Sequence, residues 1–250
     1  MSQVETLPRR DADVRNRLAI ALDVDDLVEA IRIAKELRPW FGVAKVGLEL
    51  YSAAGPDAVV EMMECGYRVF LDLKLHDIPT TVRRAAQVVG ALGASYLTLH
   101  AIGGSPMLRA GVEGLNHGAG NAGLPTPVAL AVTILTSDGD APPHVLGRRV
   151  QSAVESGCRG MVCAASDVRE AKQLGPRLVT VVPGIRPAGT GHDDQVRAST
   201  PQGALAAGAD LLVIGRAVTA AADRAKAAAE LVGPLSLERR SPDRDPTNRT

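Results

Sequence analysis

The chain has 250 residues, of which 46% are hydrophobic, so it is long enough for one large domain with a sizeable core. Its 28 basic residues balance its 28 acidic residues and only 2% are aromatic, which argues against a polyanionic partner and against stacking surfaces for single-stranded nucleic acid. Three cysteines without metal-like spacing, and the lack of a membrane-length apolar run or signal-peptide core, predict a cytoplasmic protein with no nucleic-acid or membrane partner.

The two ends of the sequence differ from the middle. Residues 1–16 are largely polar and lack periodicity, and residues 234–250 include the run Glu-Arg-Arg-Ser-Pro-Asp-Arg-Asp-Pro. Such compositions bury too little apolar surface to fold and are typical of disordered segments. We therefore expect a mobile tail over 1–16, one folded domain over 17–233 and a disordered tail over 234–250.

Between these ends, short apolar runs alternate with segments of helical periodicity. The expected strands cover 17–22, 43–46, 69–73, 96–99, 128–134, 160–163, 179–182 and 211–214. The expected helices cover 26–37, 56–64, 80–92, 106–115, 145–155, 168–174, 200–207 and 218–231. Apolar strands are typical of parallel strands covered on both faces, and eight strand–helix units predict a (β/α)8 TIM barrel. An open, doubly wound sheet is the alternative.

The stretch 70–82, Phe-Leu-Asp-Leu-Lys-Leu-His-Asp-Ile-Pro-Thr-Thr-Val, places charges where the third strand gives way to a helix. Asp72 and Lys74 are two residues apart, so their side chains share one face of the strand. Asp77 follows past the strand end, and Pro79 suits the first turn of a helix. A buried charge is costly unless paired, so the pattern indicates either a functional site or a structural Asp–Lys pair.

Polar residues also follow most of the other expected strands. In a barrel of this type, functional side chains gather at the carboxyl ends of the strands. The residues at these ends are Asp23, Lys45, Asp72, Lys74, Asp77, His100, Thr136, Ser137, Arg186, Gly215 and Arg216. Packing alone does not explain this convergence, so we expect one functional site at this mouth of the barrel.

The last two strand–helix units suggest a phosphate site. Gly215 lets the backbone approach a ligand closely, and barrels of this type often bind phosphate after strands seven and eight. Arg216 adds a guanidinium suited to phosphate oxygens, and Arg186 lies in the neighbouring loop. We expect residues 187–194 to form a flexible lid, with Gln195 holding the phosphate as it closes. An ordinary tight turn with a solvated arginine is the alternative.

Taken in chain order, these residues resemble the signature of the orotidine 5′-phosphate decarboxylase family. Asp-x-Lys-x-x-Asp alone is shared with sugar-phosphate relatives on the same barrel, but the flanking Ile-Pro and Lys-Val-Gly make the resemblance specific. It extends over residues 17–231. The matching stretches are Leu22-Asp23, Lys45-Val46-Gly47, Asp72-x-Lys74-x-x-Asp77-Ile78-Pro79, Leu135-Thr136-Ser137, Pro183-Gly184-Ile185-Arg186, Asp194-Gln195 and Val213-Ile214-Gly215-Arg216.

The resemblance implies the decarboxylation of orotidine 5′-monophosphate to uridine 5′-monophosphate, the last step of UMP biosynthesis, without metal or organic cofactor. It implies that Lys74 donates the proton, that Asp72 faces the substrate carboxylate, and that Lys45 and Asp77 complete the catalytic charge network. It further implies a homodimer with shared active sites.

The resemblance also implies roles in substrate binding. Asp23 and Lys45 would hold the ribose hydroxyls, and Thr136 or Ser137 would contact the pyrimidine. The residues implied for the phosphate are Arg186, Gln195, Gly215 and Arg216. The residues implied to complete the site of the second chain are Asp77, Ile78 and Thr81.

The residues favour this chemistry on physical grounds as well. Loss of carbon dioxide leaves a carbanion with no conjugated sink, which a fixed ammonium stabilises and then protonates. Carboxylates on both sides, Asp72 and Asp77, favour the charged form of Lys74. His76 and His100 are the other candidates for chemistry, and we expect both to be structural.

Two other enzyme classes and one binding module are the alternatives. A Schiff-base aldolase would need a neutral Lys74 amine, which neighbouring carboxylates oppose. A metal-dependent sugar-phosphate enzyme would use Asp72 as a ligand with a second acid near it, where this chain has Lys45. A phosphate-binding module without activity would leave the Asp–Lys–Asp array without a purpose.

Overall fold

The structure is a computed structural model. The described residues are 14–135, 137–138, 141–187 and 199–237. The segments 1–13 and 238–250 of the expected tails lie outside them.

The expected domain boundaries of 17 and 233 need correction at both ends. Val14, placed in the tail 1–16, packs against the hydrophobic core. The last helix runs on to Leu237, four residues into the expected tail 234–250, and Leu235 in it is 4% exposed. Single apolar residues at the edges of polar segments find partners on the barrel, which local composition does not reveal.

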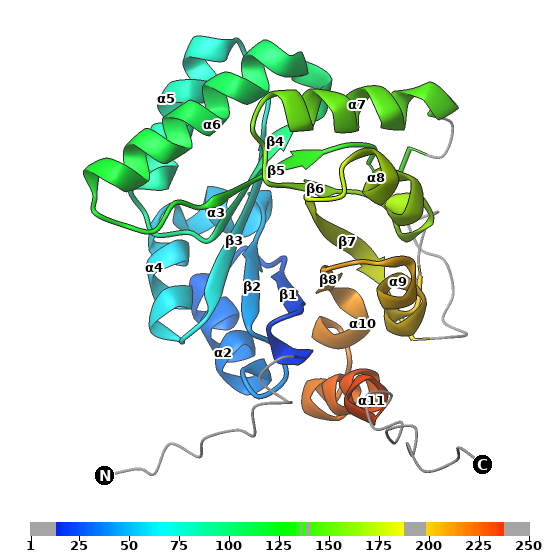
Figure 1. Ribbon diagram of the computed structural model, residues 1–250. Helices are drawn as coiled ribbons and strands as arrows, with labels where there is room; N and C mark the ends of the chain where they lie inside the picture. Colours follow the sequence, from blue (N-terminus) through cyan, green and yellow to red (C-terminus); the bar gives the residue numbers. More distant parts are fainter. Residues whose placement is uncertain (1–13, 136, 139–140, 188–198, 238–250) are drawn as a thin grey trace, which may run out of the picture.

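Eight parallel strands pair in chain order and close into a barrel, because the eighth strand also pairs with the first (Figure 1). This closure confirms the predicted (β/α)8 TIM barrel and excludes the open sheet. The strands are β1 (Leu18–Leu22), β2 (Val43–Val46), β3 (Arg68–Leu75), β4 (Tyr96–His100), β5 (Val128–Val132), β6 (Gly160–Val162), β7 (Val179–Ile185) and β8 (Leu211–Ile214).

The helices surround the barrel (Figure 1). They are α2 (Leu27–Leu37), α3 (Leu48–Ala54), α4 (Asp57–Glu64), α5 (Pro79–Gly90), η1 (Ala101–Gly103), α6 (Gly104–Asn121), α7 (Pro143–Glu155), η2 (Ala165–Asp167), α8 (Val168–Leu174), α9 (Pro201–Ala207), α10 (Arg216–Thr219) and α11 (Arg224–Leu237). The sequence did not predict α3, and the helix expected over 218–231 is divided into α10 and α11. No helix in the described part of the chain has both the length and the apolar character needed to cross a membrane.

The core has two layers that follow from the two-residue period of a strand. One layer lies between the sheet and the helices, and includes Leu18, Ile20 and Leu22 of β1. The other lies inside the barrel, where Ala19 and Ala21 of the same strand point. The inner layer consists of Ala19, Ala21, Val43, Phe70, Tyr96, Leu130, Val181, Leu211 and Val213.

Two charged side chains lie on the same strand faces as the inner layer. Lys45 is two residues beyond Val43, Asp72 is two beyond Phe70, and both therefore continue the inner faces of β2 and β3. Each is closer than its apolar neighbour to the carboxyl end of its strand. The strand period thus places these charges directly above the apolar interior of the barrel.

Helices α5 and α6 pack more closely than side chains on both would permit. A Cβ atom at Gly118 would lie 1.9 Å from the carbonyl oxygen of Gln87, and one at Gly114 would lie 2.1 Å from that of Arg83. Only glycine lets the two backbones approach so closely. This contact fixes α5, whose first turn follows the Asp77–Ile78 segment, against its neighbour.

Candidate active site

Four of the predicted residues form a chain of alternating charges at the carboxyl ends of β1, β2 and β3. Lys45 Nζ lies 2.7 Å from Asp23 Oδ1 and 3.9 Å from Asp72 Oδ2. Asp72 Oδ2 is in turn 2.8 Å from Lys74 Nζ. Each ammonium thus has a carboxylate beside it, and Asp72 lies between two cations.

The chain of charges is more exposed at its two ends than in its middle. The side chain of Asp23 is 54% exposed, whereas those of Lys45 and Asp72 are only 10% and 13% exposed. Lys74 lies between these extremes, with 33% of its side chain exposed. Electrostatic interactions strengthen where water is partly excluded, so the inner members act more strongly on a group placed beside them.

The backbone at Lys74 is unusual. Its φ angle is +49°, the only positive value at a described residue other than glycine, and this left-handed conformation costs about 1–2 kcal/mol. The pairing of β3 with β4 shifts register between Leu71 and Leu75, as a bulge does. Strain of this kind persists only where surrounding contacts fix it and often marks a functional position.

Thr98 on β4 supplies those contacts. Its fully buried hydroxyl accepts a hydrogen bond from the Lys74 N–H at 2.8 Å and donates one to Asp72 Oδ1 at 2.9 Å. One side chain therefore holds both the strained backbone and the carboxylate. Thr98 was not among the predicted site residues, although a threonine between Leu97 and Leu99 on an apolar strand was the available signal.

We expect Thr98→Val, which keeps the shape of the side chain, to impair both stability and turnover. The Lys74 N–H would lose its acceptor, which typically lowers the free energy of unfolding by about 1–3 kcal/mol. The loosened Lys74 and Asp72 should lower kcat by about tenfold or more. Urea unfolding and steady-state kinetics measure the two effects.

Thr133→Val is the matched control, because Thr133 is equally buried and its hydroxyl donates to the Val162 carbonyl, away from Lys74 and Asp72 in the hydrogen bonds of the described residues. It should show a loss of stability with little change in kcat. Unchanged kcat in Thr98→Val would contradict the positioning role of Thr98.

The charges line one wall of a cavity of about 810 Å³. Its floor includes the inner-layer residues Ala21, Phe70 and Val213. The first residues after β8 contribute another part of the lining, with Gly215 and Arg216 among them. The cavity therefore combines a charged wall, an apolar floor and the start of α10, as a site for a polar molecule with an anionic end requires.

The loop after β7 completes the lining through Arg186 and Pro187. Gly184 has a φ angle of +76°, which favours glycine, and the register of β7 with β8 shifts beside it. The Arg186 N–H donates to the Ser199 carbonyl at 2.9 Å, which ties the two ends of this loop together. The rest of the expected lid, residues 188–194, lies outside the described residues.

The structure does not bring every predicted residue to this cavity. Asp77, Ile78 and Thr81 are exposed and are not among the residues that line it. Asp77 Oδ1 instead accepts a hydrogen bond from the Ile78 N–H at 2.6 Å. Ser137 is likewise exposed and outside the lining. The predicted residues Thr136 and Gln195 lie outside the described part of the chain.

The two histidines near the site contact each other. Their ring centroids, in His76 and His100, are 5.8 Å apart, and His100 Nδ1 accepts a hydrogen bond from the Ile102 N–H at the start of η1. Burial, with the positive charge of Arg149, lowers the pKa of His100 from its usual value. A neutral His100 that caps η1 agrees with the expected structural role.

Within the described segments, no three His, Cys, Asp or Glu side chains come together as they would around a metal ion.

The chain is similar to several known proteins. A family model described as the orotidine 5′-phosphate decarboxylase / HUMPS family matches residues 16–231. The orotidine 5′-phosphate decarboxylase of Thermobifida fusca is 44% identical over 239 residues, covering 90% of this chain and 98% of the relative. That of Moorella thermoacetica is 41% identical over 235 residues, covering 89% and 93%. The crystal structure of orotidine 5′-phosphate decarboxylase from Lactobacillus acidophilus has a TM-score of 0.74 at 34% identity, covering 88% of this chain and 98% of that one. The chain therefore belongs to the orotidine 5′-phosphate decarboxylase / HUMPS family.

Proposed function

We propose that this protein is a carboxy-lyase that converts orotidine 5′-monophosphate to uridine 5′-monophosphate, the last step of de novo pyrimidine biosynthesis. Family membership supports the reaction, and relatives about 40% identical over most of the chain carry that name. The observation that carries the proposal is the contact of Lys74 Nζ with Asp72 Oδ2 at 2.8 Å beside the cavity. That pair supplies a fixed cation next to a carboxylate.

The reaction follows from this pair of side chains. The bond between the pyrimidine ring and its carboxylate breaks, carbon dioxide leaves, and the electron pair stays on the ring carbon. The Lys74 ammonium stabilises that charge and gives its proton to the carbon. Asp72, held by Thr98 and flanked by Lys45, orients Lys74 and faces the leaving carboxylate. Water then returns the proton to Lys74.

The substrate fits the cavity with its phosphate at the start of α10. Gly215, Arg216 and Arg186 line that part and offer backbone N–H groups and guanidinium groups to phosphate oxygens. Gln195 would add an amide. Asp23 and Lys45 would hold the ribose hydroxyls, and Thr136 or Ser137 the pyrimidine.

The geometry disfavours both rival enzymes. A Schiff-base lysine must lose its charge, usually by desolvation or beside another cation, whereas Lys74 lies against a carboxylate and is 33% exposed. A metal ligated by Asp72 would have to displace the ammonium groups of Lys45 and Lys74 from Asp72 Oδ2. The existing ion pairs therefore favour decarboxylation.

An ultraviolet assay tests the proposed function. Purified protein is chelated exhaustively and mixed with orotidine 5′-monophosphate, and the absorbance of the substrate is followed. We expect its conversion to uridine 5′-monophosphate at the rate seen before chelation. Absence of conversion would refute the proposal, and conversion only before chelation would favour the metal-dependent rival.

Arg216→Ala tests the phosphate site. We expect the binding of uridine 5′-monophosphate to weaken by about 1.5–3 kcal/mol, the range for a hydrogen bond to a charged group, because Arg216 is exposed at the edge of the cavity. Uridine, which lacks the phosphate, should bind almost as before. Calorimetric titration measures both, with the exposed Arg169→Ala on α8 as the matched control. If the affinities for uridine 5′-monophosphate and for uridine fell equally, Arg216 would have a structural role and not a role in phosphate binding.

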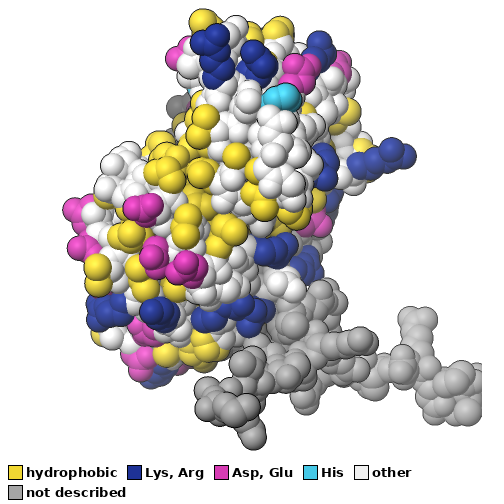
Figure 2. All heavy atoms as spheres, turned by 90° about the vertical axis from the view of Figure 1, so that its left-hand side faces the viewer, with side chains coloured by type: hydrophobic (Ala, Val, Ile, Leu, Met, Phe, Trp, Pro, Cys, Tyr) yellow, Lys and Arg dark blue, Asp and Glu magenta, His cyan; other side chains and the backbone are white. Residues whose placement is uncertain are grey.

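The exposed aliphatic residues after β2, β3 and β4 support a homodimer with shared sites. Leu48, Ile78 and Ile102 each follow one of these strands and are 55%, 66% and 56% exposed. Figure 2 shows the side of the molecule where α3 to α6 lie, with hydrophobic side chains gathered in its middle among scattered charged groups. A second copy placed over this sector would cover the aliphatic residues and receive Asp77 and Thr81.

We further propose that residues 17–233, with the short extensions described above, act as one catalytic domain in the cytoplasm. No disulfide bond joins Cys65, Cys158 and Cys163, which supports a reducing compartment.

A further inference from the structure

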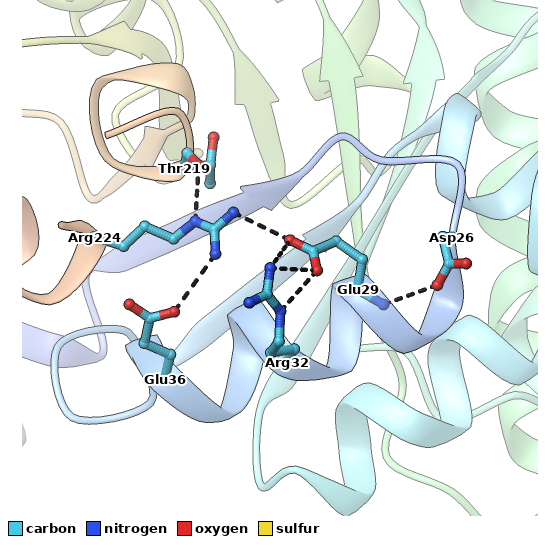
Figure 3. Close-up of polar contacts among 6 residues, drawn as sticks. All are labelled: Asp26, Glu29, Arg32, Glu36, Thr219 and Arg224. Carbon is cyan, nitrogen blue, oxygen red and sulfur yellow. Dashed lines mark hydrogen bonds and ion pairs between the residues drawn. The ribbon is translucent and has the colours of Figure 1, made fainter. Parts of the chain in front are cut away.

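Arg224, the first residue of α11, connects α10, near the end of the barrel sequence, to α2, near its beginning. Its Nε donates a hydrogen bond to the Thr219 carbonyl at 2.9 Å, and its Nη2 lies 3.1 Å from Glu29 Oε1 (Figure 3). Its Nη1 is 3.6 Å from Glu36 Oε2. One guanidinium thus contacts the end of α10 and two carboxylates of α2.

Helix α10 is only four residues long. It is a single turn, closed by hydrogen bonds from the Val218 and Thr219 N–H groups to the Gly215 carbonyl. Val218 is its fully buried residue. The residues facing the cavity include Arg216 and Thr219, so this turn is itself part of the wall. A short helix with one buried anchor needs an outside contact to keep its orientation.

On its other side Arg224 contacts α2, a helix with a capped N-terminus. Asp26 caps α2 by accepting a hydrogen bond from the Glu29 N–H at 2.9 Å. Glu29 also receives two hydrogen bonds of 2.8 Å from Arg32, a separate and exposed pair on the same carboxylate (Figure 3). Helix α2 follows the loop that carries Asp23. Arg224 therefore connects α10 to the part of the site that follows β1.

We propose that Arg224 is a positioning residue that sets the affinity for the substrate phosphate. The inference rests on the proposed function, because it takes the start of α10 as the phosphate site. The positive guanidinium satisfies a carbonyl at the C-terminal end of the turn, where a cation is favourable. It thereby holds Gly215 and Arg216, at the other end of the same turn, in the orientation that a phosphate needs.

Two methionine variants separate this role from a general loss of ion pairs. Arg224→Met keeps the alkyl stem and removes the contacts to Thr219, Glu29 and Glu36. Arg32→Met removes the other partner of Glu29 and leaves α10 untouched. Calorimetric dissociation constants for uridine 5′-monophosphate and uridine, together with KM and kcat for orotidine 5′-monophosphate, are measured on each full-length variant. Arg224→Lys serves as the conservative variant, and replaces Arg224→Met if circular dichroism shows that protein unfolded.

We expect Arg224→Met to bind uridine 5′-monophosphate about tenfold more weakly, within the range for residues that act on a site without touching its ligand. Its affinity for uridine should change less than twofold, and KM should rise about tenfold while kcat falls less than threefold. Arg32→Met should leave both affinities within twofold. Arg224→Lys keeps the positive charge but loses the planar guanidinium. It should weaken the binding of uridine 5′-monophosphate about threefold and leave the binding of uridine unchanged.

A nucleotide affinity unchanged in the Arg224 variants, or weakened equally with that for uridine, would overturn the positioning role. Wild-type protein that does not bind uridine 5′-monophosphate at all would refute the proposed function, and this inference with it.

Discussion

Replacing Lys74 by alanine is expected to abolish turnover while leaving the barrel folded. The reaction needs one group that both stabilises the carbanion and protonates it. Electrostatic stabilisation by one group is typically worth about 10²–10³ in rate, and proton transfer about 10²–10⁴. Lys45, the other lysine of the described cavity, is held between two carboxylates, Asp23 and Asp72, and is the more buried of the two lysines. The guanidinium groups of Arg186 and Arg216 do not give up a proton in proteins. We therefore expect kcat to fall by at least about four orders of magnitude.

The measurement is single-turnover kinetics with orotidine 5′-monophosphate, with folding followed by circular dichroism. Lys226→Ala is the matched control, since Lys226 is a lysine on α11 whose side chain is 69% exposed. Borohydride added with substrate should give no covalent adduct on Lys74 of the wild type. Near-normal turnover by folded Lys74→Ala would rule out its role, and a trapped adduct would revive the aldolase.

The strands were predictable because their signal is local. Apolar runs bounded by turns located all eight strands to within a few residues, and their number predicted the closed barrel. Helix α3 was missed because it is short and lies between Gly47 and Gly55, and closely spaced glycines are typical of loops. The division of α10 from α11 was missed because alanines continue through 217–228 without a breaker.

The part of the site that depends on the two-residue period of the strands was predictable from the sequence. Asp23, Lys45 and Asp72 followed from position at strand ends, and they form one connected chain of charges. The left-handed backbone of Lys74 did not follow, because a bulge depends on the pairing of β3 with β4. Thr98 was missed for the same reason, since its partners lie 24 and 26 residues away in the sequence.

The opposite end of the barrel holds another network that only the fold reveals. Asp210, before β8, accepts hydrogen bonds from Lys172 Nζ at 2.6 Å and from the N–H and hydroxyl of Thr180. Burial would raise the pKa of Asp210, but these hydrogen bonds outweigh it and the pKa falls below its usual value. Charges at the amino ends of strands in such barrels serve stability, and this one ties β7, β8 and α8 together.

Mixing two inactive variants, Lys74→Ala and Asp77→Ala, is expected to restore activity when their subunits exchange. The structure gives the motive, because Asp77 is exposed, lies past the end of β3 and is absent from the lining of its own cavity. In a two-fold dimer with shared sites, Asp77 of each chain would reach the site of the other. One site of the heterodimer then collects both substitutions and the other collects neither.

The expected yield is specific. Random exchange of equal amounts makes about half of the dimers heterodimers, each with one intact site, so activity should approach about a quarter of that of the wild type. Native mass spectrometry counts the heterodimers, and the ultraviolet assay measures turnover on the same sample. Lys74→Ala mixed with Asp72→Ala is the control, because both residues belong to the site of one chain and each site of that heterodimer keeps one lesion. If each site were built from a single chain, the Lys74→Ala and Asp77→Ala mixture would stay inactive although heterodimers formed, and the shared site would be refuted.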